Sequence, residues 1–241
     1  MKSIHAYLTL RCLNGCSYCS NRLPVGEAVR HGELVSAYWQ GLFVRIQDFS
    51  LYLTGGEPFL YRGLADILSD LKRSVFVYTS LREPIKSVLK KVRRRDRVIF
   101  RCSYHPEMRY YEQFRAQYDE VRRLGFSASI FMVDRGAKSR KVVDRFKEDG
   151  YGVIVDADQR KIPCKKGRVA CRLPTTIVSP SGHIYHCVSR MLRGVGRGNM
   201  IFDRHIPEPA TIECGEPHLC TPCDRSASFQ EEKDGGKVSE G

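Results

Sequence analysis

The chain has 241 residues, of which 42% are hydrophobic and 28% are charged, and its formal net charge is +13. This composition is typical of a folded globular protein and excludes an intrinsically disordered or fibrous chain. No run of about 18 apolar residues is present, and no apolar signal region precedes the first predicted strand, so we expect a cytoplasmic protein without a membrane span.

Short apolar runs alternate with helical periodicity over residues 4–156. The apolar runs predict strands at residues 4–10, 49–53, 75–79, 98–103, 127–133 and 151–155. Helices are predicted between them at residues 33–47, 64–71, 84–95, 111–124 and 142–150. Six βα-type units indicate an α/β fold, a partial (β/α)6 parallel barrel over residues 1–156, with ligand sites at the carboxyl ends of its strands.

The character of the sequence changes after residue 156. Residues 157–224 are rich in cysteine, proline and glycine, and we expect them to form a small cysteine-rich C-terminal extension. Within it, Pro180-Ser181-Gly182 predicts a hairpin turn between strands at residues 175–178 and 183–186. Residues 225–241 contain few apolar side chains and are expected to be a disordered tail.

Three cysteines follow the first predicted strand directly. Cys12, Cys16 and Cys19 are close enough in sequence to bind one metal centre from a single loop. Thiolates at this spacing favour zinc or an iron-sulfur cluster. Zinc would need a fourth ligand, and none lies nearby in the sequence. Three ligands on a 4Fe-4S cluster leave one iron open for a substrate or cosubstrate.

The spacing C-x3-C-x2-C, with Tyr18 before its last cysteine, resembles the radical S-adenosylmethionine (SAM) superfamily. A second motif, Gly55-Gly56-Glu57-Pro58, follows the second predicted strand and strengthens the resemblance. The resemblance implies that Cys12, Cys16 and Cys19 ligate a 4Fe-4S cluster. The open iron of that cluster would bind SAM and cleave it reductively to a 5′-deoxyadenosyl radical.

The resemblance also implies the residues that contact SAM. Gly55, Gly56 and Glu57 would receive the amino group of SAM, since glycines permit close backbone approach and a carboxylate complements an ammonium. Tyr18 would lie near the adenine. Ser103, at the end of the fourth strand, and His105 would contact the ribose or the carboxylate of SAM; alternatively, His105 only shapes the turn before Pro106.

Six cysteines occur in the C-terminal extension, and their spacing is similar to that of the SPASM/twitch extensions of radical SAM enzymes. This resemblance implies an auxiliary 4Fe-4S cluster. The expected ligands are Cys171, Cys187, Cys220 and Cys223, and the second-choice ligands are Cys164 and Cys214. A zinc ribbon is the structural alternative for this group. Cys102 lies within the fourth strand and is expected to be a buried thiol.

The resemblance implies an enzyme, and a fully ligated auxiliary cluster would accept an electron from a substrate radical. The excess of basic residues suggests an anionic partner, although solubility alone would also explain it. Because the chain is small, the main expectation is oxidation or rearrangement of a small, anionic, sugar-like or nucleotide-like substrate, with an electron donor such as flavodoxin or ferredoxin. The alternatives are a ribosomally made peptide, a nucleic-acid base, and a non-enzymatic, zinc-bearing module that binds nucleic acid.

Overall fold

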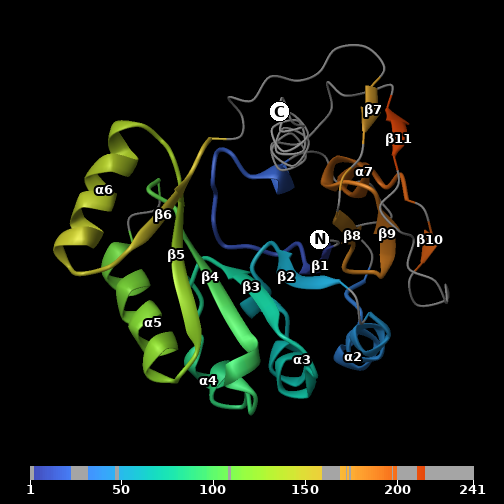
Figure 1. Cartoon of the computed structure of the whole chain (residues 1–241), viewed down its shortest axis with the longest axis horizontal. Coiled ribbons are helices and arrows are strands. Elements are labelled where there is room, and N and C mark those ends of the chain that lie inside the picture. Colours follow the sequence, from blue (N-terminus) through green and yellow to red (C-terminus); the bar gives the residue numbers. More distant parts are fainter. Residues whose placement is uncertain are drawn as a thin grey trace, which may run out of the picture.

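A computed structural model describes residues 3–22, 32–46, 49–107, 110–158, 169–171, 173, 175–196, 198–199 and 211–214. The C-terminal tail predicted for residues 225–241, together with Cys164, Cys220 and Cys223, lies outside these residues. In the part of the chain that is described, nine strands form one sheet in the order β10-β9-β8-β1-β2-β3-β4-β5-β6 (Figure 1).

The centre of the sheet is parallel from β8 to β6. Its N-terminal strands are β1 (Ser3–Thr9), β2 (Ser50–Gly55), β3 (Val75–Thr79), β4 (Val98–Tyr104), β5 (Ser127–Val133) and β6 (Val153–Asp156). Each pairs in parallel with the next. The predicted α/β class and the six predicted strands are confirmed, and the carboxyl ends of the strands meet at one edge of the sheet.

Helices cover one face of this sheet. The α-helices are α2 (Ser36–Arg45), α3 (Leu64–Asp70), α4 (Lys86–Leu89), α5 (Tyr111–Arg123) and α6 (Ala137–Glu148), and short 3-10 helices are η1 (Ser20–Arg22), η2 (Pro58–Leu60) and η3 (Arg95–Arg97). Alternate strand residues, such as Ile4, Leu53, Val77 and Phe100, pack beneath them in the main core. Gly125 follows α5 with φ +85°, as expected of a glycine that ends a helix.

The fourth helix is shorter than the sequence predicted. The periodic stripe indicated a helix over residues 84–95, but α4 is a single turn and Ile85 is its N-cap. Residues 95–97 form η3 instead. The apolar residues of the stripe are nevertheless buried, since Ile85, Leu89 and Val92 are each at most 2% exposed. Burial therefore explains the stripe without a continuous helix.

The C-terminal residues extend the same sheet. Strands β8 (Thr175–Val178) and β9 (His183–Tyr185) form the predicted hairpin, and β8 pairs in parallel with β1. Gly182 has φ +83° in the turn. The further elements are β7 (Val169–Cys171), α7 (Val188–Arg193), β10 (Gly198–Asn199) and β11 (Ile212–Cys214). The division of the chain into a barrel domain and a separate extension that begins at residue 157 stays a prediction.

Helix α7 lies on the opposite face of the sheet from α2 to α6. Val188, Met191 and Leu192 pack there against Tyr7 and Ile177, in a second, smaller core. None of the helices among the described residues is both long and apolar enough to cross a membrane.

Candidate functional site

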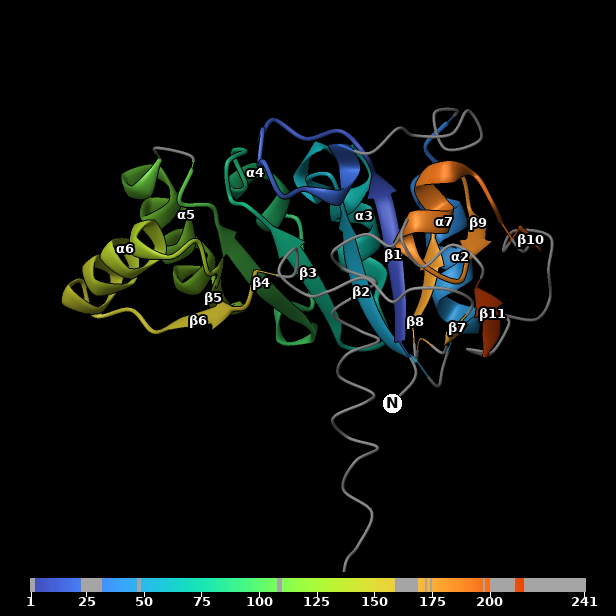
Figure 2. The same ribbon diagram turned by 90° about the horizontal axis from the view of Figure 1, so that it is seen from above.

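The loop that carries Cys12, Cys16 and Cys19 lies at the carboxyl ends of the central strands (Figure 2). Contacts from two other strand ends hold it there. After β3, Arg82 donates from Nη1 to the Leu13 carbonyl oxygen at 2.7 Å and to Asn14 Oδ1 at 3.1 Å. After β4, Glu107 accepts hydrogen bonds from Ser17. The cysteine loop thus lies at the carboxyl ends of the strands, which is where the sequence predicted ligand sites.

The two motifs of the predicted SAM site are in direct contact. The N–H of Gly56 donates to the Thr9 carbonyl oxygen at 2.8 Å, and the N–H of Glu57 donates to the Arg11 carbonyl oxygen at 2.8 Å. A Cβ atom at Gly55 or Gly56 would lie 2.1 Å from one of these two carbonyl oxygens. The close approach that requires glycine here is therefore between the Gly-Gly-Glu-Pro turn and the start of the cysteine loop.

Glu57 is 2% exposed, and its carboxylate binds protein donors. Oε2 accepts hydrogen bonds from the Ser80 N–H at 2.8 Å and the Ser80 hydroxyl at 2.7 Å, while Oε1 accepts from the Thr79 hydroxyl at 2.8 Å and the Phe59 N–H at 3.2 Å. Burial raises the pKa of Glu57, and the hydrogen bonds from Ser80 and Thr79 act in the opposite direction. Glu57 thus ties the end of β2 to the end of β3; its contact with the SAM amino group stays a prediction.

Tyr18 and His105, both predicted to contact SAM, lie together although they are far apart in the sequence. Tyr18 Oη is 2.5 Å from His105 Nδ1, and their ring centroids are 5.8 Å apart. Burial lowers the pKa of His105 to about 4, so the imidazole is neutral near pH 7. Ser103 is the second-to-last residue of β4. It is partly exposed and pairs with Phe131 of β5.

A charged network that the sequence analysis did not identify adjoins this pair. Arg135 Nη2 donates to Glu107 Oε1 at 2.9 Å, and Arg135 Nη1 donates to Asp158 Oδ2 at 2.7 Å. The Arg135 guanidinium lies 5.3 Å from the centroid of the Tyr18 ring, and its buried Nε has no hydrogen-bond partner among the described residues. The network joins the cysteine loop to the ends of β4, β5 and β6.

The three loop cysteines differ in exposure. Cys16 is 5% exposed, and burial, followed by the proximity of Cys19 and Cys12, raises the pKa of its thiol to about 12. Burial likewise raises the pKa of Cys12. Among the described residues, no group of three or more His, Cys, Asp or Glu side chains is arranged to hold a single metal ion.

The donor set does fit an iron-sulfur cluster. In a cubane cluster, three thiolates bind three different irons, so their sulfurs need not converge on one point. The chain offers three soft donors from one loop, which is packed on a glycine turn at the edge of a parallel sheet. Ligation requires the thiolate form, and the raised thiol pKa values mean that metal binding must displace protons.

Three of the C-terminal cysteines, Cys171, Cys187 and Cys214, lie within the described residues, and no disulfide joins them to one another or to another described cysteine. Antiparallel pairing places Cys171 opposite Ile212, and Cys214 is two residues further along β11. Cys171 and Cys214 therefore lie diagonally on one face of the two-stranded sheet. Cys187 is the N-cap of α7, and its Sγ accepts from the Arg190 N–H at 3.4 Å. Cys102 is fully buried, as predicted.

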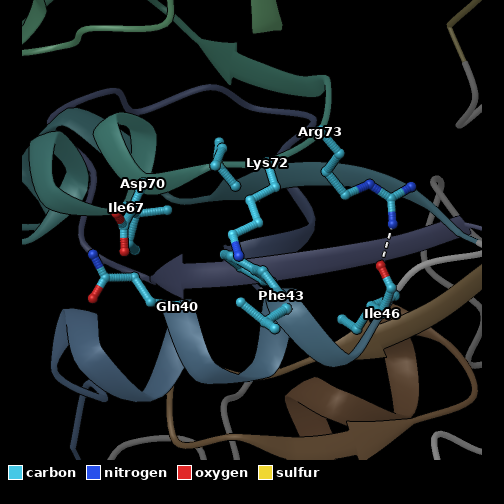
Figure 3. A pocket seen from close by; sticks show the side chains of 9 residues that line it. Gln40, Phe43, Ile46, Ile67, Asp70, Lys72 and Arg73 are labelled. Atoms are coloured by element: carbon cyan, nitrogen blue, oxygen red, sulfur yellow. Dashed lines mark hydrogen bonds between the residues drawn. The ribbon is translucent and has the colours of Figure 1, made fainter.

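A small pocket lies at the opposite end of the barrel from the cysteine loop. It is lined by α2, α3 and the segment before β3, including Gln40, Phe43, Asp70 and Lys72 (Figure 3). Arg73 donates to the Ile46 carbonyl oxygen at its rim. Its place at the amino end of β3 separates it from the cysteine loop and the Gly-Gly-Glu-Pro turn.

No protein-family model matches the chain. A PqqA peptide cyclase from Rhizobium meliloti (strain 1021) is 38% identical over 79 residues, which are 32% of this chain and 20% of the relative. A PqqA peptide cyclase from Xanthomonas euvesicatoria pv. vesicatoria (strain 85-10) is 32% identical over 82 residues, 33% of this chain and 21% of the relative. The chain thus matches about a fifth of the length of these relatives.

Solved structures are similar over most of the chain. Streptococcus suis SuiB bound to its precursor peptide SuiA matches with a TM-score of 0.60 and 11% identity, over 84% of this chain and 63% of SuiB. The protein anSMEcpe with bound S-adenosylmethionine matches with a TM-score of 0.59 and 12% identity, over 84% of this chain and 78% of that chain. These neighbours are radical SAM enzymes, and the chain shares their fold. The resemblance to radical SAM enzymes that the two motifs predicted is therefore confirmed for the fold.

Proposed function

We propose that the chain is a radical SAM enzyme and that its substrate is a ribosomally made peptide. The observation that carries the proposal is the backbone contact between the cysteine loop and the Gly-Gly-Glu-Pro turn at the ends of β1 and β2. Two motifs that are separate in the sequence are joined at the edge where parallel barrels bind ligands. The fold similarity to S-adenosylmethionine-bound neighbours supports the same reading.

In this proposal, Cys12, Cys16 and Cys19 hold a 4Fe-4S cluster beside SAM. When bound, the cluster and SAM together supply hydrogen-atom abstraction from a substrate. The chain's own residues position these groups. Glu57 fixes the glycine turn through Ser80 and Thr79, and the Ser17–Glu107 hydrogen bonds fix the loop. Tyr18, which directly precedes Cys19, is held by the contact of its hydroxyl with the neutral His105.

A peptide substrate is favoured over the small anionic molecule that was the main expectation from the sequence. The relatives by sequence are named PqqA peptide cyclase, and one structural neighbour is bound to its precursor peptide. The small-molecule expectation rested on the length of this chain. Because the match covers only about a fifth of the relatives, that length does not bear on the substrate.

The auxiliary cluster belongs to the same proposal. Its expected ligands remain Cys171, Cys187, Cys220 and Cys223, of which the last two lie outside the described residues. The β7–β11 register makes Cys214 a neighbour of Cys171, which supports Cys214 as a ligand. An electron donor of the flavodoxin or ferredoxin type would supply the reducing equivalent.

The test is an anaerobic incubation of the reconstituted protein with SAM, a reductant and synthetic peptides translated from the short reading frames beside its gene. We expect the mass of the peptide to change and deuterium from labelled peptide to appear in 5′-deoxyadenosine. If 5′-deoxyadenosine forms while the peptide stays unmodified and unlabelled, the enzyme class stands and the peptide assignment is wrong. A pool of phosphorylated small molecules serves as the parallel substrate set.

A further inference from the structure

One face of the sheet carries a charged residue that the proposed cofactor site does not use. Alternate residues of β1 to β5 point away from α2 to α6, and we call this side the inner face; it includes His5, Tyr52, Phe76, Tyr78, Arg101 and Phe131. None of these six belongs to the main core, and each is partly exposed.

Arg101, in the middle of β4, lies among four aromatic rings of the inner face. Its guanidinium carbon is 5.1 Å from the ring centroids of Phe76 and Phe131, 5.4 Å from that of Tyr78 and 5.8 Å from that of Tyr52. These distances are within the range of cation–π interaction. The rings come from β2, β3 and β5, so the sheet register brings them around one cation.

The guanidinium has more donors than the described residues satisfy. A guanidinium carries five N–H groups, and Arg101 donates from Nη1 to Tyr78 Oη at 2.8 Å. No carboxylate of the described residues forms an ion pair with it; Asp156 on the edge strand β6 interacts with it only at longer range. A cation held in aromatic surroundings without an anionic partner favours binding of an anion that fits its planar fork.

Among the described residues, the positive charge of the inner face is limited to one guanidinium, and the carboxyl group of Asp156 at the edge of this face offsets it in part, so a monoanion fits better than a dianion. The other basic group there, His5, has its pKa lowered to about 4 by burial and then by Arg101, so it is neutral near pH 7. A phosphate dianion would meet only one positive charge among the described residues of this face. A carboxylate matches one guanidinium in charge and in bidentate geometry.

The position of Arg101 relates it to the cofactor site. Arg101 and Ser103 are two residues apart in β4 and therefore on the same face, with Ser103 nearer the carboxyl end and the cysteine loop. A peptide whose carboxylate binds Arg101 would lie on the face of the sheet that also carries Ser103. We propose that Arg101 and its aromatic walls bind the carboxylate of the peptide substrate on the inner face. This inference rests on the proposed function.

The test uses the full reconstituted chain and three pools of random hexapeptides, each acetylated at the N-terminus. The first pool has one Glu and an amidated C-terminus, the second has Gln in its place, and the third has Gln and a free C-terminal carboxylate. Equilibrium dialysis with mass spectrometry measures retention. We expect wild-type protein to retain the Glu pool or the free-carboxylate pool at least about tenfold better than the Gln pool, which identifies the source of the carboxylate.

Arg101→Gln should abolish this preference, and Arg101→Met should do so too if the first variant folds poorly. Arg140→Gln, which removes an exposed charge from α6, is the matched control and should keep it. The inference is overturned if the wild-type protein shows no preference, or if the Arg101 variants retain it.

Formation of 5′-deoxyadenosine without peptide separates the two proposals. Its absence from wild-type protein contradicts the enzyme class, whereas its presence in the variants shows an intact cofactor site.

Discussion

At the scale of single residues, the glycines of the second motif show how tightly the site is packed. Gly56→Ala would place a methyl group 2.1 Å from the Arg11 carbonyl oxygen, a backbone atom that cannot rotate away. We expect a loss of about 3 kcal/mol in the free energy of unfolding, because the turn and the cysteine loop must separate. Urea unfolding monitored by circular dichroism measures the change.

Gly41→Ala is the matched control for that variant. Gly41 lies in α2 with open space around the position of its Cβ, so the added methyl group meets nothing. We expect a gain of about 0.5–1 kcal/mol from helix propensity. Equal effects of the two substitutions would contradict the close packing of the two motifs.

Two histidines make the stability of the protein depend on pH. His5 and His105 have folded-state pKa values of about 4, whereas an unfolded histidine titrates near about 6.5. The unfolded chain therefore binds protons first, and stability is lost as the pH falls from about 6.5 to 4. Each histidine contributes a slope of at most about 1.4 kcal/mol per pH unit.

His5→Phe tests this dependence while keeping an aromatic ring against Tyr52, whose centroid lies 4.6 Å from that of His5. Urea unfolding at a series of pH values should show a shallower slope for the variant between pH 6.5 and 4, and parallel curves above pH 7. A slope identical to that of the wild-type protein would show that His5 is not the group responsible.

At the scale of elements, the cysteine loop depends on the strand ends for its position. Glu107 accepts from the Ser17 N–H at 3.0 Å and from its hydroxyl at 2.8 Å, and Arg135 adds a third bond to the same carboxylate. These partners hold the pKa of Glu107 below its ordinary value, so the carboxylate is charged near pH 7. The loop is thus fixed by a charge-assisted contact.

Glu107→Ala should release the loop. Hydrogen–deuterium exchange measured by mass spectrometry should become at least about tenfold faster for the backbone amides around Ser17, because the acceptor of its N–H is lost. Glu148→Ala, on the exposed side of α6, should leave this exchange unchanged. If the two variants exchange alike, the loop is held by other contacts.

Individual elements were predicted well where local sequence decides them. The apolar runs that predicted six strands end within a few residues of the observed strands, and the Pro180-Ser181-Gly182 turn forms its hairpin. Helix α7 was not predicted, because six residues are too few to show a helical period. The stripe of α4 was correctly predicted to be buried but overestimated the length of the helix.

At the scale of the whole molecule, the pairing of strands that are far apart in the chain could not be predicted from the sequence. Nothing local in Thr175–Val178 indicates that it pairs in parallel with β1 and so joins the cysteine-rich region to the main sheet. The same holds for the Ser17–Glu107–Arg135 contacts, since charged residues are common at strand ends and only the fold brings these together. The two motifs of the site, by contrast, were predictable because each is a short segment with fixed spacing.

The central claim is that Cys12, Cys16 and Cys19 hold a cluster that cleaves SAM. The most direct measurement is 5′-deoxyadenosine formation by anaerobically reconstituted protein with SAM and dithionite, compared with the variant in which all three cysteines are alanine. The wild-type protein should form 5′-deoxyadenosine and the triple variant none. Failure of the iron-loaded wild-type protein to form it, or equal formation by the variant, would contradict the account.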